Sequence, residues 1–265
     1  MVDTPIVFFD LDGTLLTSEF KVANSSIDAI KTIKKLGAEP VIATGRNISE
    51  IGNVLELTGI RSCVAMNGQY VMYEGKVIYE NPLDQNEVKL LHTTASQNGH
   101  DLAFYNAEYI TVTAGNSDVI TKNYIERVGT KYPPVDETMY LKSPIHLMVL
   151  FCNIGEELYY QEQFPYFQFV RHSPLGCDVY PRDTSKASGI QRLMEHQNLS
   201  LENSYAFGDG LNDIEMFQLV KHPIAMGNAV ENLKSISKYV TTSNNEDGIM
   251  KGLHQCGLLD SGVIK

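Results

Sequence analysis

The sequence predicts an α/β protein with a doubly wound, parallel, Rossmann-like core that is interrupted by an inserted α+β domain. Short apolar runs alternate with helical periods at the start of the chain, and the same alternation returns after Lys186. Buried parallel strands joined by helical crossovers produce this pattern. Between these two parts, helices mix with pairs of strands. We therefore expect a core of residues 1–83 and 183–265 and an inserted domain of residues 84–182.

The first elements of the core can be read directly from apolar spacing. The run IVFFD, residues 6–10, predicts a strand that is covered on both faces. Ile27, Ile30 and Ile33 recur at helical spacing, and Gly37 then predicts the end of that helix. The same criteria predict strands at residues 40–45 and 62–68, a helix at 47–59 and a hairpin at 69–80 that turns at Glu74-Gly75.

The rest of the chain divides into a mixed region and a second alternating region. In the mixed region we expect helices near residues 85–98, 117–130 and 155–164, and strands near 102–105, 109–113, 145–151, 166–170 and 177–181. In the second alternating region we expect helices at 186–198, 211–220, 230–237 and 247–257, and strands at 204–210, 223–229 and 238–242.

The overall charge limits the classes of partner. The chain has 265 residues and a formal net charge of −11 at pH 7, which gives no electrostatic reason to bind nucleic acid or an anionic membrane. No stretch approaches the ~20 apolar residues of a membrane span, and the N-terminus lacks the basic region of a signal peptide. We expect a cytoplasmic protein, with monomer and homodimer both left open.

The cysteines give no motif. Their wide spacing, without a C-x-x-C pair, argues against a zinc site or a disulfide framework and fits a reducing compartment. Each of them is expected to be a small buried apolar residue. The four are Cys63, Cys152, Cys177 and Cys256.

Polar residues follow several predicted core strands at the point where each strand ends. In open α/β sheets, ligands bind beyond the carboxyl ends of the strands, so these residues are candidates for one pocket. They are Asp10, Asp12 and Thr14 after the first strand, Thr44, Gly45 and Arg46 after the second, Lys186 at the return to the core, and Asp209, Asn212 and Asp213 in the stretch GDGLND.

The residue types in this set favour phosphoryl transfer. Asp10 and Asp12 point the same way if the backbone is extended, and with Asp209 they form a cluster of hard oxygen ligands that suits Mg²⁺. The Lys186 ammonium would offset part of their repulsion, and Thr44 with the following N–H groups forms a phosphate cradle. One carboxylate can then attack phosphorus while the other transfers a proton.

These motifs resemble those of a known family. DLDGT, ATGR, Lys186 and GDGLND look like the four motifs of the haloacid-dehalogenase-like superfamily of phosphatases, and MNGQY, AMGNA and NNEDGI resemble its Cof-like subclass with a large α/β cap. The resemblance implies that Asp10 is the nucleophile and a Mg²⁺ ligand. It implies that Asp12 is the general acid/base, with its carbonyl on the metal, and that Asp209 and Asp213 complete the metal site. Lys186 would bridge Asp10 and the phosphate.

The resemblance also implies a set of substrate contacts. Thr44 and the Gly45 amide would hold phosphate, Arg46 and Asn212 would lie near the phosphate or the cap, and Asn67 would line the pocket. In the cap, Arg171 and His172 follow the end of a predicted strand and are candidates to face the substrate.

The function expected from these features is hydrolysis of a small phosphorylated metabolite, preferably a sugar phosphate, through an aspartyl phosphate. A large lid hinders macromolecular substrates, which favours such metabolites. A sugar phosphomutase, a phosphatase of nucleotides or cofactor phosphates, and a non-enzymatic metabolite sensor stay open as alternatives.

Overall fold

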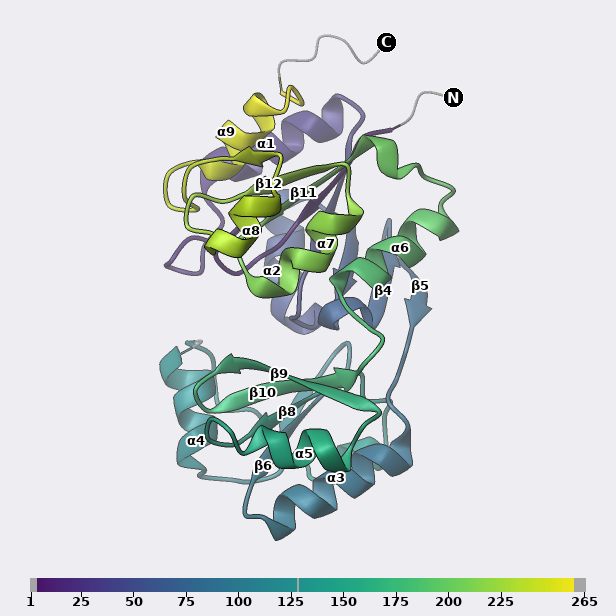
Figure 1. The fold of residues 1–265 in the computed structure, drawn as a ribbon, viewed down its shortest axis with the longest axis vertical. Helices are drawn as coiled ribbons and strands as arrows, with labels where there is room; N and C mark the ends of the chain where they lie inside the picture. The colour runs from purple at the N-terminus through teal and green to yellow at the C-terminus, as the bar shows by residue number, and fades with distance from the viewer. Residues whose placement is uncertain (1–3, 128, 260–265) are drawn as a thin grey trace. The chain divides into compact units, whose positions relative to one another are not determined.

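The computed structural model in Figure 1 describes residues 4–127 and 129–259. The chain forms two compact units: residues up to Glu80 together with those from Ser185 onward, and Asn81–Thr184. These boundaries lie beside the ones that the sequence predicts, while the roles of catalytic core and cap remain predictions. In the described ranges, no helix combines the length and apolar character that a membrane crossing needs.

The first unit is built on a mostly parallel sheet. Among the described residues the sheet has eight strands in the order β13-β12-β11-β1-β2-β3-β4-β5. All pairs from β13 to β3 are parallel, and β3, β4 and β5 are joined as antiparallel neighbours. The strands are β1 (Ile6–Phe9), β2 (Glu39–Ala43), β3 (Ser62–Ala65), β4 (Tyr70–Tyr73), β5 (Lys76–Glu80), β11 (Ser204–Gly208), β12 (His222–Ala225) and β13 (Tyr239–Val240).

Helices cover both faces of this sheet, as Figure 1 shows. Val7 and Phe9 pack on one face against α1 (Asn24–Lys35), α2 (Ile48–Thr58) and α9 (Gly248–Gln255). Ile6 and Phe8 pack on the other face against α6 (Lys186–His196), α7 (Ile214–Leu219) and α8 (Glu231–Ile236). Burial on both faces explains why β1 is apolar throughout. The predicted doubly wound α/β core is confirmed.

The second unit is an antiparallel sheet with its own apolar core. Its described strands have the order β7-β6-β8-β10-β9. The strands are β6 (Asp101–Tyr105), β7 (Ile110–Val112), β8 (Leu147–Phe151), β9 (Phe167–Ser173) and β10 (Gly176–Pro181); the helices are α3 (Gln85–Gln97), α4 (Asp118–Thr121) and α5 (Glu157–Gln163). The predicted α+β character of the insertion is confirmed.

Some elements are shorter or less regular than their patterns predict. The expected helix at 117–130 is α-helical only in α4 and continues as a wider π-helical segment, η2 (Lys122–Arg127). The expected helix at 211–220 begins with a 3₁₀ turn, η5 (Leu211–Asp213), before α7. Apolar spacing cannot distinguish these tighter and wider turns, because their i+3, i+4 and i+5 contacts bury similar faces.

Candidate active site

Strand β1 carries Asp10 to the middle of the carboxyl edge of the core sheet. β1 lies between β2 and β11, and Asp10 N–H donates to Phe207 O (3.0 Å), which extends the ladder by one residue. The chain leaves β1 toward β2 on one side, whereas β11 on the other side belongs to the returning segment. A crevice at such a reversal is the usual ligand site of an open α/β sheet.

The loop after β1 brings Asp209 against Gly13. Gly13 has φ +80°, a conformation that favours glycine, and a Cβ there would lie 2.2 Å from Asp209 Oδ2. The hydroxyl of Thr14 donates to Asp209 Oδ1 (3.0 Å). The close approach therefore depends on the absence of a side chain at Gly13.

Lys186 is the first residue of α6, and its ammonium lies inside the carboxylate cluster. Its side chain is 0% exposed, and Nζ donates to Asp10 Oδ1 (2.5 Å) and to Asp213 Oδ1 (2.7 Å). Ser185 caps the helix through a hydrogen bond from Ser188 N–H, which fixes where the helix begins. The structure thus places Lys186 beside Asp10, as the sequence analysis expected.

A close contact between backbones sets the position of α6. A Cβ on Gly68 would lie 2.2 Å from Ser185 O, and one on Gly189 would lie 2.5 Å from Val64 Cγ1 and 2.7 Å from Gly68 Cα. Gly68 follows Met66 and Asn67, and all three have positive φ (93°, 49° and 53°). This left-handed turn after β3 forms the surface on which α6 begins.

Asp213 is fully buried, and both oxygens of its carboxylate accept hydrogen bonds. Oδ2 accepts hydrogen bonds from the N–H groups of Asp209 and Gly210 (both 3.0 Å), and Oδ1 accepts from Lys186. These bonds hold the turn that carries Asp209 and also hold the ammonium. The geometry therefore favours a positioning role for Asp213.

Thr44, Gly45 and Asn67 lie together after β2 and β3. Thr44 is buried, its Oγ1 accepts from Arg46 N–H (3.1 Å), and its carbonyl accepts from Asn67 N–H (3.1 Å). A Cβ on Gly45 would lie 3.3 Å from the Asn67 amide. Asn47 then caps α2, so the turn leads directly to a helix N-terminus.

Asp12 is placed differently from the expected pairing with Asp10. The backbone after β1 turns instead of extending, with Thr14 N–H donating to Leu11 O (3.2 Å). The Asp12 carboxylate, 51% exposed, accepts two bonds from Arg46: Nε to Oδ2 (2.8 Å) and Nη2 to Oδ1 (2.5 Å). The group of described carboxylates within 4.8 Å of one another is instead Asp10, Asp209 and Asp213.

The electrostatics of this group suit a divalent cation. Burial raises the pKa of Asp10 well above its usual range, helped by Asp213 and Asp209, although Lys186 opposes the shift. Burial and the charge of Asp213 raise the pKa of Asp209 to about 6. Ionisation of all three carboxylates leaves two negative charges that Lys186 does not balance. Hard oxygen ligands that carry this excess of negative charge fit Mg²⁺ or a similar divalent cation.

Comparisons with known proteins agree with this geometry. A family model described as haloacid dehalogenase-like hydrolase matches residues 7–253. The chain belongs to this family. It is 36% identical over 258 residues to the putative phosphatase YkrA of Bacillus subtilis, covering 97% of this chain and 100% of that protein. The predicted family is confirmed, and so is the predicted enzyme class, a phosphatase.

Two solved structures extend the similarity of this hydrolase to the whole fold. A hypothetical protein from Geobacillus kaustophilus aligns with a TM-score of 0.91 and 40% identity, over 96% of this chain and 99% of that one. The sugar phosphatase BT4131, of subclass IIB, aligns with a TM-score of 0.84 and 30% identity, over 96% and 100%.

Two asparagines of this hydrolase, Asn228 in AMGNA and Asn244 in NNEDGI, have no role among the expectations from sequence. Asn228 Nδ2 donates to Gly13 O (2.8 Å) and lies 3.4 Å from Asp209 Oδ2. Asn244 donates its N–H to Asn228 Oδ1 (3.0 Å) and its side-chain amide to Leu16 O (2.8 Å). These hydrogen bonds connect the loop after β1 to the segments that follow β12 and β13. The signal in the sequence that could have found Asn228 is a polar residue shortly after the apolar run PIAM.

Two other predicted contact residues have different surroundings. Asn212 is exposed, and a Cβ on Gly210 would lie 2.7 Å from its Oδ1. Arg171 in the second unit binds Glu157 and four backbone carbonyls, which commits its guanidinium to that unit's own structure.

Proposed function

We propose that the protein is a Mg²⁺-dependent phosphatase that hydrolyses small phosphorylated metabolites, with sugar phosphates as the expected class. The observation that carries this proposal is the buried Lys186 ammonium, which bridges Asp10 and Asp213 beside Asp209. A buried cluster with surplus negative charge costs stability, which a binding function explains.

The metal is assigned to Asp10 and Asp209, with the Asp12 carbonyl as a further ligand implied by the family resemblance. When bound, Mg²⁺ supplies positive charge that draws phosphate oxygens toward the carboxylates and stabilises the charge of the transition state. Asp213 holds Lys186 and the Asp209 turn through the hydrogen bonds described above. Lys186 offsets charge between the nucleophile and the incoming phosphate.

Catalysis is proposed to begin with nucleophilic attack by Asp10. One Asp10 oxygen bonds to phosphorus, the bond from phosphorus to the leaving oxygen breaks, and that oxygen takes a proton from Asp12. Water then attacks the aspartyl phosphate while Asp12 takes a proton back, which releases phosphate and restores Asp10. Arg46 holds Asp12 in this structure, so proton donation requires the pair to open.

Phosphate binding is assigned to the turn after β2. The Thr44 hydroxyl and the Gly45 N–H lie just before α2, where N–H groups and the helix dipole favour an anion. Asn67 stands beside Gly45 and would contact the substrate there. The similarity to the sugar phosphatase BT4131 supports a sugar phosphate as the substrate.

The test is a phosphate-release screen of the purified protein across sugar phosphates, nucleotides and cofactor phosphates, with Mg²⁺ and with chelator. We expect Mg²⁺-dependent release that is fastest with a sugar phosphate. Fastest release from a nucleotide or cofactor phosphate would overturn the substrate class. Formation of an isomeric sugar phosphate without free phosphate would indicate a mutase, and no turnover of any substrate would contradict the proposal.

A further inference from the structure

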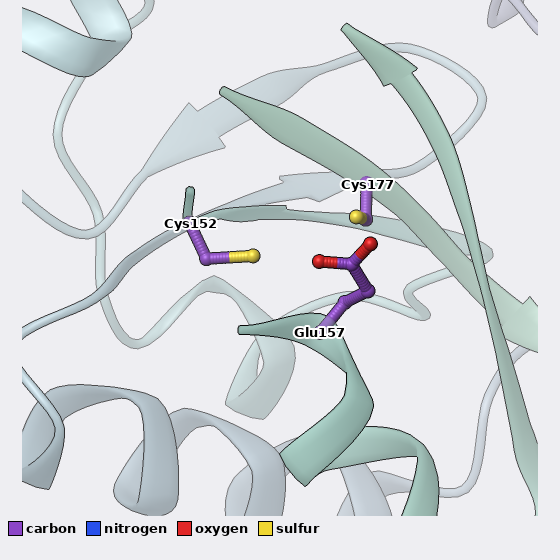
Figure 2. Close-up of side chains that lie close together, drawn as sticks. All are labelled: Cys152, Glu157 and Cys177. Atoms are coloured by element: carbon purple, nitrogen blue, oxygen red, sulfur yellow. The ribbon is translucent and has the colours of Figure 1, made fainter. Parts of the chain in front are cut away.

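Two of the four cysteines meet inside the second unit, far from each other in sequence. Cys177 on β10 lies opposite Leu150 on β8, and Cys152 N–H donates to Leu175 O (3.1 Å) just beyond β8. Cys152 and Cys177 are therefore diagonal neighbours on one face of the sheet. The two residues are only 2% and 0% exposed, and Figure 2 shows the Cys152 sulfur pointing toward Cys177 and Glu157.

A carboxylate completes the group. Glu157 is the first residue of α5, and Figure 2 shows its carboxylate directed toward the two sulfurs. One ligand atom from each of Cys152, Glu157 and Cys177 lies within 4.8 Å of the other two. This convergence joins the residue that follows β8, the start of β10 and the start of α5.

Arg171 supplies a positive charge at the edge of the group. Its Nε and Nη2 donate to the two oxygens of Glu157, and Nη2 also contacts Cys152 Sγ (3.4 Å). The Arg171 contact lowers the pKa of Glu157 to about 2, so this carboxylate is ionised. Glu157 Oε1 accepts a hydrogen bond from Arg171 Nε, and a carboxylate oxygen has a second lone pair that can bind an ion.

The strand register favours a bridging ion over a disulfide. Diagonal neighbours in antiparallel strands have Cα atoms roughly 7–8 Å apart, whereas disulfides need about 4.4–6.8 Å. A metal ion about 2.3 Å from each sulfur spans a wider separation. Charge points the same way, because two thiolates and one carboxylate carry three negative charges, which one divalent cation and Arg171 would balance.

We propose that Cys152, Cys177 and Glu157 form a binding site for one thiophilic divalent cation, with Zn²⁺ as the expected ion. Binding forms two metal–sulfur bonds and one metal–oxygen bond and releases the two thiol protons to solvent. The ion would link β8, β10 and α5 and so stabilise the second unit. Residues 153–156 between Cys152 and Glu157 are exposed, so the group lies next to the surface of the second unit.

The experiment is a Co²⁺ titration of the full-length, reduced protein in excess Mg²⁺, which under the proposed function fills the carboxylate cluster of the core. Thiolate ligation of Co²⁺ gives a near-ultraviolet charge-transfer band that oxygen ligands do not give. We expect this band to saturate at one ion per chain and to disappear when Zn²⁺ is added. About two protons should be released per Zn²⁺ bound in calorimetry.

Matched variants separate this site from others. Cys177→Ser and Cys152→Ser should each lose most of the band, whereas Glu157→Gln should keep it with an affinity reduced about tenfold or more. Cys256→Ser and Asp209→Asn should keep both the band and the affinity. Circular dichroism checks that each variant is folded. If a cysteine variant does not fold, the Co²⁺ affinity of Glu157→Gln tests the site instead.

Several results would overturn the proposal. They are a protein without the band, a band that Cys177→Ser leaves intact, or a band that Cys256→Ser removes. Loss of two thiols per chain on air oxidation, together with no band in the reduced protein, would show that the pair is a redox disulfide instead.

Discussion

Lys186 and its two carboxylate partners show how residue-level energetics point to function. Removing charges from water costs several kcal/mol per ion, and the penalty is recovered only when partners and hydrogen bonds are complete. Lys186 meets this condition, because Asp10 and Asp213 raise its pKa despite its burial. Asp10 does not meet it, since its own pKa is raised by burial and by neighbouring acids. Burial and the neighbouring acids therefore disfavour the ionised form of Asp10, and a cation bound beside it would offset this cost.

The nucleophile can be tested separately from the fold through Asp10→Asn. The amide cannot attack phosphorus, so we expect kcat to fall by roughly 10⁴-fold or more. Because the site disfavours the ionised carboxylate, the free energy of unfolding of the metal-free variant should stay within about 1 kcal/mol of the parent. Phosphate release and chemical denaturation measure the two quantities. Retained turnover would remove Asp10 from its proposed role.

We expect Asp12 to contribute to catalysis but little to the free energy of unfolding. Its ion pair with Arg46 is half exposed, and such pairs contribute about 0–1 kcal/mol. Asp12→Asn should lower kcat by ~10²–10⁴-fold while the unfolding free energy changes by less than about 1 kcal/mol. Glu19→Gln, which breaks the exposed pair with Lys21, is the control and should leave kcat unchanged. Equal kcat values in the two variants would refute the acid/base assignment.

The loop after β1 is the element that brings its own Asp10 and the distant Asp209 to one site. Gly13→Ala adds a methyl group 2.2 Å from Asp209 Oδ2 at a φ of +80°. Gly37→Ala has the same kind of φ, +94°, but its Cβ would meet nothing within 4 Å. The positive φ should cost each variant about 1 kcal/mol of stability through backbone strain, and Gly13→Ala should lose more because its methyl group clashes with Asp209. Only Gly13→Ala should lose Mg²⁺ affinity and most activity, as titration and kinetics would reveal.

Helix α6 offers a second matched pair. Gly189→Ala would push against Val64 and Gly68 and displace the helix start that carries Lys186. Gly52→Ala in α2 meets nothing within 4 Å, so it should stabilise the protein by about 0.5–1 kcal/mol through helix propensity. We expect Gly189→Ala to lower both the melting temperature and kcat. An active, stabilised Gly189→Ala protein would show that the contact with the turn after β3 does not position Lys186.

At the scale of the whole molecule, we expect the carboxylate cluster to make stability depend on pH and on the proposed metal together. The raised pKa of Asp209 means that the metal-free folded protein holds this proton more tightly than the unfolded chain. The free energy of unfolding of the metal-free protein should therefore fall as pH rises from about 4, the usual carboxyl pKa, toward about 6. The raised pKa of Asp10 acts in the same direction.

Mg²⁺ should reverse this trend, because it binds the ionised carboxylates. We expect the rise in melting temperature caused by Mg²⁺ to be large above about pH 6 and to vanish as pH falls below that value. Thermal unfolding with and without Mg²⁺ across this range measures the effect, and Asp209→Asn should flatten it. A Mg²⁺ effect that is independent of pH would place the metal elsewhere.

Sequence alone determined the strands, most helices and the identity of the strand-end polar residues. A strand buried on both faces has to be apolar, and its polar neighbours mark where it ends, so IVFFD and PVIATG each carry local information about the sheet and its edge. Lys186 was recognisable only from its place at the return to the core and from motif resemblance, because a lysine 176 residues from Asp10 carries no local signal of its partner.

Tertiary structure alone decided which of these groups touch. The turn after β1 directs Asp12 to Arg46, and strand register brings Cys152 beside Cys177, although neither pair is visible in spacing along the chain. The physical reason is that periodicity reports which face of an element is buried, whereas side-chain partners depend on the register and close backbone contacts between elements distant in sequence.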